Sequence, residues 1–335
     1  MAAVCGNAAR AFEFNLDSIA AMGRFPRFCV NTYRWGDRFF NTYDSTYVQG
    51  SGTKFNVKII QDNWLNHLQF RIPSDRTVEL RSDPSTTMGI YLTYLALSVG
   101  YDVNVSKLFG LSGRSRQRYQ FAFNCALLAV EAYWESNDVG TKVTRFGEYK
   151  DIDEKFTGVN TKSWGLDVYY FFNHRRYSQS AAFAYSRIQR RSQGSFYAGL
   201  SMYQQRYDID FSSLPEPMLE YLPESWENYH YRVNTHNYGF RLGYGYNWVF
   251  NRHWVLGVAE SPVVGFSRGR INSAETKTNF SLYNHFKLSV VWNNRRWFAG
   301  AVGAVDSSIV SDRETLFVGS NFNVTASVGY RFNLW

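Results

Sequence analysis

Two features that define other classes of protein are missing from this sequence. No stretch approaches the ~18 to 20 uninterrupted apolar residues that a membrane-spanning helix needs, so a bundle of transmembrane helices is excluded. The cysteines Cys5, Cys29 and Cys125 are odd in number and lack paired spacing. This excludes both a disulfide framework and a zinc ligand set. No helical domain, internal repeat or low-complexity tract stands out either.

Aromatic residues, in contrast, are abundant. They make up 18% of the 335 residues, with 24 Tyr, 27 Phe and 10 Trp, although the mean hydropathy is only -0.36. Strands of a membrane barrel alternate between lipid and a polar interior, so average hydropathy does not reveal them. The two observations together are typical of a transmembrane β-barrel.

The C-terminal segment has the clearest periodicity. Even-numbered residues from Phe322 to Leu334 are apolar or aromatic, whereas odd-numbered residues from Asn323 to Asn333 are polar or small. A period of two with one apolar face indicates a β-strand. Such a strand would expose an unpaired edge in water, but closure of a barrel in a bilayer removes the edge. The predicted fold is therefore all-β, a transmembrane antiparallel up-and-down β-barrel.

Alternating runs continue through the chain from about Thr86 onwards. We predict about twelve strands, with ten to fourteen as alternatives, at residues 86–94, 97–103, 119–123, 128–134, 164–172, 178–188, 195–206, 238–249, 254–266, 280–292, 297–305 and 323–334. Polar turns flanked by tryptophan, at residues 250–253 and 293–296, are typical of an interfacial aromatic girdle. Long polar segments at residues 207–235 and 306–321 are predicted external loops. This strand order puts the long segment 137–162 on the periplasmic side.

The N-terminal quarter is less regular. We interpret residues 1–23 as a leader with the remnant of a secretory signal, because small residues ending in Ala8-Ala9-Arg10-Ala11 resemble a cleavage region. Residues 24–85 are predicted to be an irregular segment. It either contains a hairpin, at residues 54–60 and 65–72, or packs inside or beneath the barrel. The barrel itself is assigned to residues 86–335.

Several separated motifs resemble a known family. They are Tyr170-Phe171-Phe172-Asn173 with Tyr177-Ser178, Gln189-Arg190-Arg191-Ser192-Gln193-Gly194-Ser195, Gly243-Tyr244-Gly245-Tyr246-Asn247-Trp248-Val249 and Val328-Gly329-Tyr330-Arg331-Phe332. In this order they resemble an uncharacterised family of Bacteroidota outer-membrane proteins, known only as a domain of unknown function. The resemblance implies an outer-membrane barrel in a Gram-negative bacterium. It supplies no catalytic residues.

Polar residues in the lumen phase of the strands are the candidate functional residues. The basic ones are Arg241, Lys287 and Arg331, the acidic ones are Asp102, Glu131 and Asp167, and His285 joins them. One interpretation is that opposite charges pair across a narrow, filled interior, as in small barrels. The alternative is that the basic residues line an anion-favouring pore. Glycines in the same phase, Gly239, Gly243 and Gly245, either leave room for bulky inward side chains or a plug, or only relieve strand curvature.

Enzymatic function and most ligands find little support. A membrane-embedded lipase would need a serine beside His285 on the outer wall, but His285 is predicted to face inward. We therefore predict no catalytic site, no metal and no cofactor. Arginine clusters around Arg116, Arg176 and Arg190 suit the phosphates of outer-membrane lipid or lipopolysaccharide better than nucleic acid, for which no motif is present. Plain solvation at a strand end is the commoner explanation for such clusters.

Three functions remain after these exclusions. A structural or partner-binding barrel, whose long loops contact an envelope protein, is favoured over a porin-like channel and over a lipid-acting enzyme. A soluble secreted β-sandwich is the rival at the level of the fold.

Overall fold

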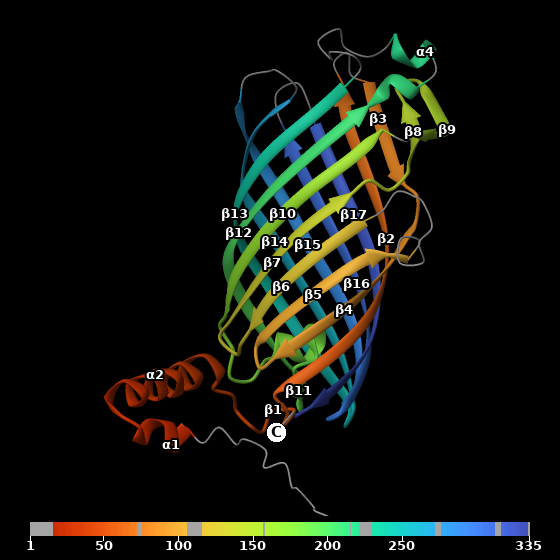
Figure 1. The fold of residues 1–335 in the computed structure, drawn as a ribbon. Coiled ribbons are helices and arrows are strands. Elements are labelled where there is room, and N and C mark those ends of the chain that lie inside the picture. The colour runs from red at the N-terminus through yellow and green to blue at the C-terminus, as the bar shows by residue number, and fades with distance from the viewer. Residues whose placement is uncertain are drawn as a thin grey trace, which may run out of the picture.

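The computed structural model describes eight stretches of the chain. They are residues 16–72, 76–105, 116–156, 158–214, 216–220, 230–271, 276–311 and 316–333. Most of the expected leader, residues 1–15, lies outside them. Within them the chain forms a tall antiparallel barrel with two helices beside one end (Figure 1).

In the described part of the chain, twelve strands form the closed wall. The wall consists of β2 (Phe55–Ile72), β4 (Ser85–Tyr94), β5 (Leu97–Asn104), β6 (Arg116–Asn124), β7 (Leu128–Asn137), β10 (Val159–Phe171), β12 (Gln193–Asp210), β13 (His230–Asn251), β14 (Trp254–Ile271), β15 (Lys277–Asn294), β16 (Trp297–Ser311) and β17 (Leu316–Phe332). β17 closes the barrel by pairing with β2, from Phe332 opposite Phe55 to Phe317 opposite Phe70. Closure leaves no free edge along this pair.

Side chains alternate between the two faces of the wall, as period-two strands require. On β13 the residues that point outward are apolar and exposed, namely Phe240, Leu242, Tyr244 and Trp248. The residues that point inward on the same strand are polar and buried, namely Asn237, Arg241 and Asn247. An apolar outer face around a polar interior is the arrangement expected of a barrel whose outer solvent is lipid.

The two ends of the barrel differ in their connections. At one end, which we call the turn end, residues 252–253 and 295–296 form two-residue turns between paired strands. At the opposite loop end, the connections are longer and carry additional structure. The C-terminal residues of β17 lie at the turn end, where Trp248, Trp254 and Trp297 are exposed on the outer face.

Two helices precede the barrel and lie at the turn end. They are α1 (Leu16–Ala21) and α2 (Arg24–Asn41). The carbonyl of Phe40 accepts hydrogen bonds from the amides of Ala126 (2.9 Å) and Leu127 (3.1 Å), in the turn between β6 and β7. Among the described residues, no helix has the length and apolar character needed to cross a membrane.

One long connection at the turn end folds inward as a plug. We call residues 172–192 the plug segment; it contains the π-helical turn η1 (Ser180–Ala184) and β11 (Arg187–Gln189). β11 pairs with β1 (Val48–Gly50), which links the plug to the chain that leads into β2. Tyr177, Ala182 and Tyr185 of the plug are almost fully buried.

The loop end carries an extension of the barrel sheet and an apolar cluster. The extension consists of β3 (Arg76–Ser82), β8 (Thr141–Phe146) and β9 (Tyr149–Phe156), and β3 pairs with the loop-end half of β2. The helical turns η2 (Phe211–Ser213) and α4 (Glu216–Leu219) follow β12. An apolar cap joins these elements to the wall and consists of Leu68, Phe70, Val78, Leu80, Val143, Phe146, Val159, Tyr207, Ile209, Phe211, Leu214 and Met218.

The structure corrects the predicted start of the barrel. Residues 55–72 form one continuous wall strand, β2, rather than a hairpin in an irregular segment that extends to residue 85. Residues 178–188, predicted to be a wall strand, belong to the plug segment instead. The predicted number of twelve wall strands is nevertheless confirmed. The prediction omitted β2 and counted residues 178–188 as a wall strand, and these two errors offset each other.

Correcting these two strands also changes the connections. The segment 137–162 lies at the loop end, together with the connection between β12 and β13, and not on the side of the tight turns. Most of the predicted loop 306–321 is strand, because β16 runs to Ser311 and β17 starts at Leu316. The long strands therefore carry polar residues well beyond the apolar belt.

Candidate functional site

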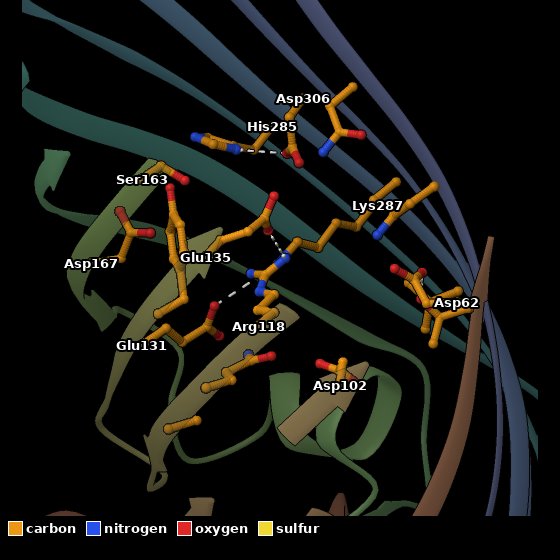
Figure 2. Close-up of a pocket in the computed structure, with 18 of the residues that line it drawn as sticks. Asp62, Asp102, Arg118, Glu131, Glu135, Ser163, Asp167, His285, Lys287 and Asp306 are labelled. Atoms are coloured by element: carbon orange, nitrogen blue, oxygen red, sulfur yellow. Dashed lines mark hydrogen bonds and ion pairs between the residues drawn. The ribbon is translucent and has the colours of Figure 1, made fainter. Parts of the chain in front are cut away.

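The lumen contains a polar cavity between the plug segment and the apolar cap. Its volume is about 370 Å³. Ten charged side chains line it: the carboxylates of Asp62, Asp102, Glu131, Glu135, Asp167 and Asp306, and the cations of Lys58, Arg118, Arg241 and Lys287. Figure 2 shows that charged groups from several strands point toward one another across this space. The lining therefore carries more negative than positive charge.

Arg241 on β13 is hydrogen-bonded at all three nitrogens of its guanidinium. Its guanidinium donates to Asp167 on β10 (2.6 Å), to the hydroxyls of Ser201 and Ser261 (3.1 Å each), and to the hydroxyl of Tyr203 (2.8 Å). Both members of the Arg241–Asp167 ion pair are largely buried. A buried, charge-assisted hydrogen bond of this kind is stronger than a neutral one, and it ties β10 to β13 across the intervening β12.

A second ion pair crosses the lumen. The ammonium of Lys287 on β15 lies 3.9 Å from the carboxylate of Glu131 on β7, five strands away around the wall. Glu131 also accepts a hydrogen bond of 2.6 Å from the hydroxyl of Tyr169. Because the partners come from well-separated strands, this pair occupies space through which a pore would have to pass.

A third group of charges lies on the side of the wall formed by β2, β6 and β7. Arg116 on β6 donates to Asp62 on β2 (3.1 Å) and to Glu135 on β7 (2.8 Å). The neighbouring Arg118 lies 3.8 Å from the same Glu135 carboxylate. The sequence analysis left this arginine cluster either solvated at a strand end or at lipid phosphates, and the structure corrects both alternatives for Arg116 and Arg118, because both point into the lumen.

His285 belongs to a hydrogen-bonded chain that connects three strands. Its Nδ1 lies 2.8 Å from the Asp306 carboxylate and its Nε2 lies 3.3 Å from the Tyr203 hydroxyl. Figure 2 shows the ring of His285 pointing at Asp306 inside the barrel. Tyr203 also donates to Asp167 (2.8 Å), so this chain joins the cluster around Arg241. Both nitrogens of the ring are therefore engaged in the internal network.

Asp102 on β5 also faces the cavity. One of its carboxylate oxygens accepts a 2.6 Å hydrogen bond from the hydroxyl of Tyr91. The ammonium of Lys58 lies over the ring of Tyr91, 4.7 Å from its centroid. Six of the seven residues singled out by the sequence therefore line the cavity.

Arg331, the seventh, lies nearer the turn end, where it holds the plug segment. Its guanidinium donates to the carbonyl of Tyr185 (3.0 Å from Nε), to the side-chain oxygen of Asn293 (2.8 Å) and to the carbonyl of Arg295 (2.7 Å). It also stacks on the ring of Phe298, 4.5 Å from the centroid. Arg331 is 1% exposed and pairs with carbonyl oxygens rather than with a carboxylate.

Gln189 is the second anchor of the plug. Its side-chain amide donates to the carbonyls of Arg176 (2.7 Å) and Arg191 (3.0 Å). Its side-chain oxygen accepts from the amide of Ser178 (3.0 Å) and from Asn247 on the wall (3.1 Å). The buried side chain of Gln189 thus joins both limbs of the plug segment to β13.

Glycines on the wall make room for the plug. A methyl group in place of the Gly245 hydrogen would overlap the hydroxyl of Tyr177, and one at Gly300 would lie 2.8 Å from the ring of Tyr185. Close packing of this kind requires the absence of a side chain at both positions. The sequence phase of Gly245 pointed to a bulky inward neighbour, and the structure identifies it as a plug tyrosine.

Sequence reasoning missed several members of the network. Asp62 and Lys58 lie on β2, which was assigned to an irregular segment, and Asp306 was assigned to a loop. Asp306 shares the inward phase of Val302 and Ala304, and this phase is the signal that identifies it as a lumen residue. In the described part of the chain, no group of three or more His, Cys, Asp or Glu side chains is arranged to hold a metal ion.

The sequence matches one family model over nearly its whole length. The family is described as a domain of unknown function, DUF4421, and the match covers residues 42–332. The chain belongs to this family. A search among curated proteins gives no match. The match spans both the wall strands and the plug segment, and the family description assigns no activity.

Solved outer-membrane barrels are similar in overall shape. The outer-membrane protease OmpT from Escherichia coli is 10% identical with a TM-score of 0.40, over 83% of this chain and 97% of that one. The translocator domain of the autotransporter NalP from Neisseria meningitidis is 13% identical with a TM-score of 0.40, over 94% and 98%. The COG4313 outer-membrane channel from Pseudomonas putida F1 is 11% identical with a TM-score of 0.34, over 85% and 97%. Because these scores are low, the barrel assignment rests on the strand pairing of this chain itself.

Proposed function

We propose that this DUF4421 protein is an outer-membrane barrel of a Gram-negative bacterium with a structural or partner-binding role and a closed polar interior. The observation that carries the proposal is the Lys287–Glu131 pair, which spans the lumen between strands five apart. The apolar outer face and the exposed tryptophans at the turn end support a membrane location. The resemblance carried by the sequence motifs adds a Bacteroidota origin to the proposal.

Both ends of the lumen favour a closed barrel over a channel. At the turn end, Arg331 and Gln189 hold the plug segment to the wall. At the loop end, the ring of Tyr207 on β12 lies 5.5 Å from the ring of Phe317 on β17, five strands away. Side chains that meet across the barrel support a closed lumen, because conduction requires a continuous water-filled path.

The charge of the cavity argues against an anion-favouring channel in particular. Six carboxylates and four cations line it. Arg241 and Lys287, the residues that would attract anions, are each paired with a carboxylate. An anion in this cavity would have to displace an internal partner and pass an excess of negative charge.

The network also argues against the lipid-acting enzyme. A hydrolase needs its histidine beside a nucleophile at a surface that the lipid reaches. His285 lies in the lumen, bonded to Asp306 and to Tyr203.

In this proposal, the surface that contacts an envelope partner is formed by the structured connections of the loop end, including β8, β9 and α4.

Removal of Arg241 tests whether the interior is a closed core. The Arg241→Ala variant leaves Asp167 buried without its cation, and we expect a loss of unfolding free energy of about 3 to 5 kcal/mol. The matched control is Lys287→Ala, whose ion pair is longer and partly exposed; we expect a loss below about 1 kcal/mol there. Urea titrations of the refolded proteins measure both. Unchanged stability of the Arg241 variant, with a shift in ion selectivity, would favour the channel.

A further inference from the structure

Helix α2 presents an aromatic face without a protein partner in the described structure. Phe25, Phe28, Trp35 and Phe39 form this aromatic stripe, and their exposed fractions are 75%, 66%, 64% and 53%. The spacing of three, seven and four residues keeps them on one side of a helix. The rings of Trp35 and Phe39 are stacked with centroids 5.4 Å apart. A contiguous exposed surface of this kind marks an interaction site.

The opposite side of α2 is partly covered by α1. Val30 is buried there, Arg34 forms an ion pair of 2.6 Å with Asp17 of α1, and Arg27 donates to the carbonyl of Ala20. Exposed arginines, Arg24 and Arg38, border the aromatic stripe. The helix is therefore amphipathic, and α1 fixes which side is left open.

The position of α2 orients that open side. The hydrogen bonds that the amides of Ala126 and Leu127 donate to the Phe40 carbonyl attach the C-terminal end of α2 to the rim of the barrel. Figure 1 shows α2 extending sideways from the turn end, with α1 below it on the side away from the barrel wall. Because α1 covers the side opposite the aromatic stripe, the stripe faces back toward the lipid-exposed wall.

The turn end is also strongly basic. Among the described residues outside the wall strands, the connections at this end carry nine basic residues: Lys54, Arg175, Arg176, Arg187, Arg190, Arg191, Arg252, Arg295 and Arg296. Among the described residues of these same connections, Asp44 is the one acidic residue. Its carboxylate lies 3.8 Å from Nε of Arg176. A basic rim below an apolar, aromatic wall complements a surface of anionic phosphate headgroups.

From the aromatic stripe, its arginine borders and this rim, we infer that α2 lies in the interface of the lipid leaflet at the turn end and binds anionic phospholipid. The aromatic stripe inserts at the level of the acyl boundary, and Arg24 and Arg38 reach the phosphates. The occupant of this surface is thus the bilayer itself, rather than a second copy of the chain. The inference requires the barrel to cross the membrane but is independent of whether the lumen conducts.

Two labelling positions on α2 test the inference in the full-length protein. Phe25 and Arg27 lie on nearly opposite sides of the helix, because successive residues are 3.6 to a turn. Each is changed to Cys, with Cys5→Ser and Cys29→Ser, and the buried Cys125 is kept. An environment-sensitive fluorophore is attached, and the protein is reconstituted in nanodiscs that contain phosphatidylglycerol. Heat-modifiable migration on a gel checks that each variant is folded.

The quenchers report what covers the stripe. We expect a nitroxide attached near the top of the lipid acyl chain to quench the label at position 25 at least about twofold more than at position 27, and aqueous iodide to do the reverse. Equal quenching by lipid nitroxide at both positions would overturn the inference. Protection of position 25 from both quenchers would also overturn it, since a protein would then cover the stripe.

Charge reversal tests the anionic component. The Arg24→Glu, Arg38→Glu double variant should lose at least about half of the lipid quenching at position 25, whereas Arg24→Lys with Arg38→Lys should retain it. Replacing phosphatidylglycerol by phosphatidylcholine should weaken quenching in the original sequence in the same direction. An effect of the same size for the Glu and Lys variants would contradict binding to anionic headgroups.

Discussion

The two ends of the barrel close the same lumen by different means. At the turn end, a polar plug is held by hydrogen bonds from Arg331, Gln189 and Asn247 to backbone and amide groups. At the loop end, the closing groups are the apolar side chains of the cap, among them Phe70, Leu80 and Phe211. Closure by the plug depends on the direction of hydrogen-bond donors and acceptors, whereas closure by the cap depends on how completely apolar side chains fill the volume.

The two kinds of closure also face different surroundings. The plug segment lies among tight turns and a rim of arginines, where a hydrogen-bonded loop finds water or headgroups on one side. The cap packs against the sheet extension formed by β3, β8 and β9, which shields the apolar groups of the cap. The comparison indicates that single substitutions should reduce stability most at the cap and less at the plug.

The largest expected effect is therefore at the cap. Phe211 is fully buried, and its ring lies 6.3 Å from that of Phe70. We expect Phe211→Ala to lower the unfolding free energy by about 3 to 5 kcal/mol, because it removes buried surface and leaves a cavity. Phe211→Leu, which keeps most of the volume, should cost less than about 1.5 kcal/mol. Equal losses in urea titrations of both variants would argue against closure by packing.

The wall that both ends share should show the next largest effect. Val324 points outward and is exposed, while the adjacent Asn323 lines the lumen. We expect Val324→Arg to cost about 2 to 4 kcal/mol in refolding titrations in lipid, because the charge would enter hydrocarbon. Asn323→Arg should cost less. The reverse order would place water, and not lipid, outside the wall.

The plug should be the most tolerant of the three regions. Gln189→Leu removes donors and acceptors from buried partners, so we expect a loss of about 1 to 3 kcal/mol. The neighbouring Arg190 is exposed and bonds Gln49 at 3.0 Å. Arg190→Ala should therefore change stability by less than about 0.5 kcal/mol. A loss at position 189 that exceeds the loss for Phe211→Ala would invert the comparison of the two ends.

The same contrast explains which strands the sequence could predict. Between residues 230 and 332, most outward residues in the middle of the strands are apolar, whereas many inward residues are polar or small, so alternation indicates strands directly. In the loop-end half of β2 the pattern of polar and apolar residues inverts. Leu68 and Phe70 point into the cap, whereas His67 and Gln69 point outward. The strand therefore lacks a single apolar face, and its polarity suggested an irregular segment.

The plug illustrates the opposite error. Residues 178–188 combine small and aromatic side chains in a way that resembles a strand, but Ala182 and Tyr185 pack against the wall from inside. The phase of Arg241, Lys287, Asp102, Glu131 and Asp167 was readable from the sequence, since it follows from the wall strands. Which of them meet was not, because the Lys287–Glu131 contact depends on how the barrel closes.

Conductance of the purified, refolded protein in a planar lipid bilayer tests the closed lumen most directly. With the plug segment, the Lys287–Glu131 pair and the apolar cap in place, we expect insertion without stable single-channel steps in either polarity. Folding is checked on the same preparation by heat-modifiable migration on a gel. A stable, anion-selective conductance of the folded protein that weakens in the Arg241→Ala variant would contradict the closed lumen.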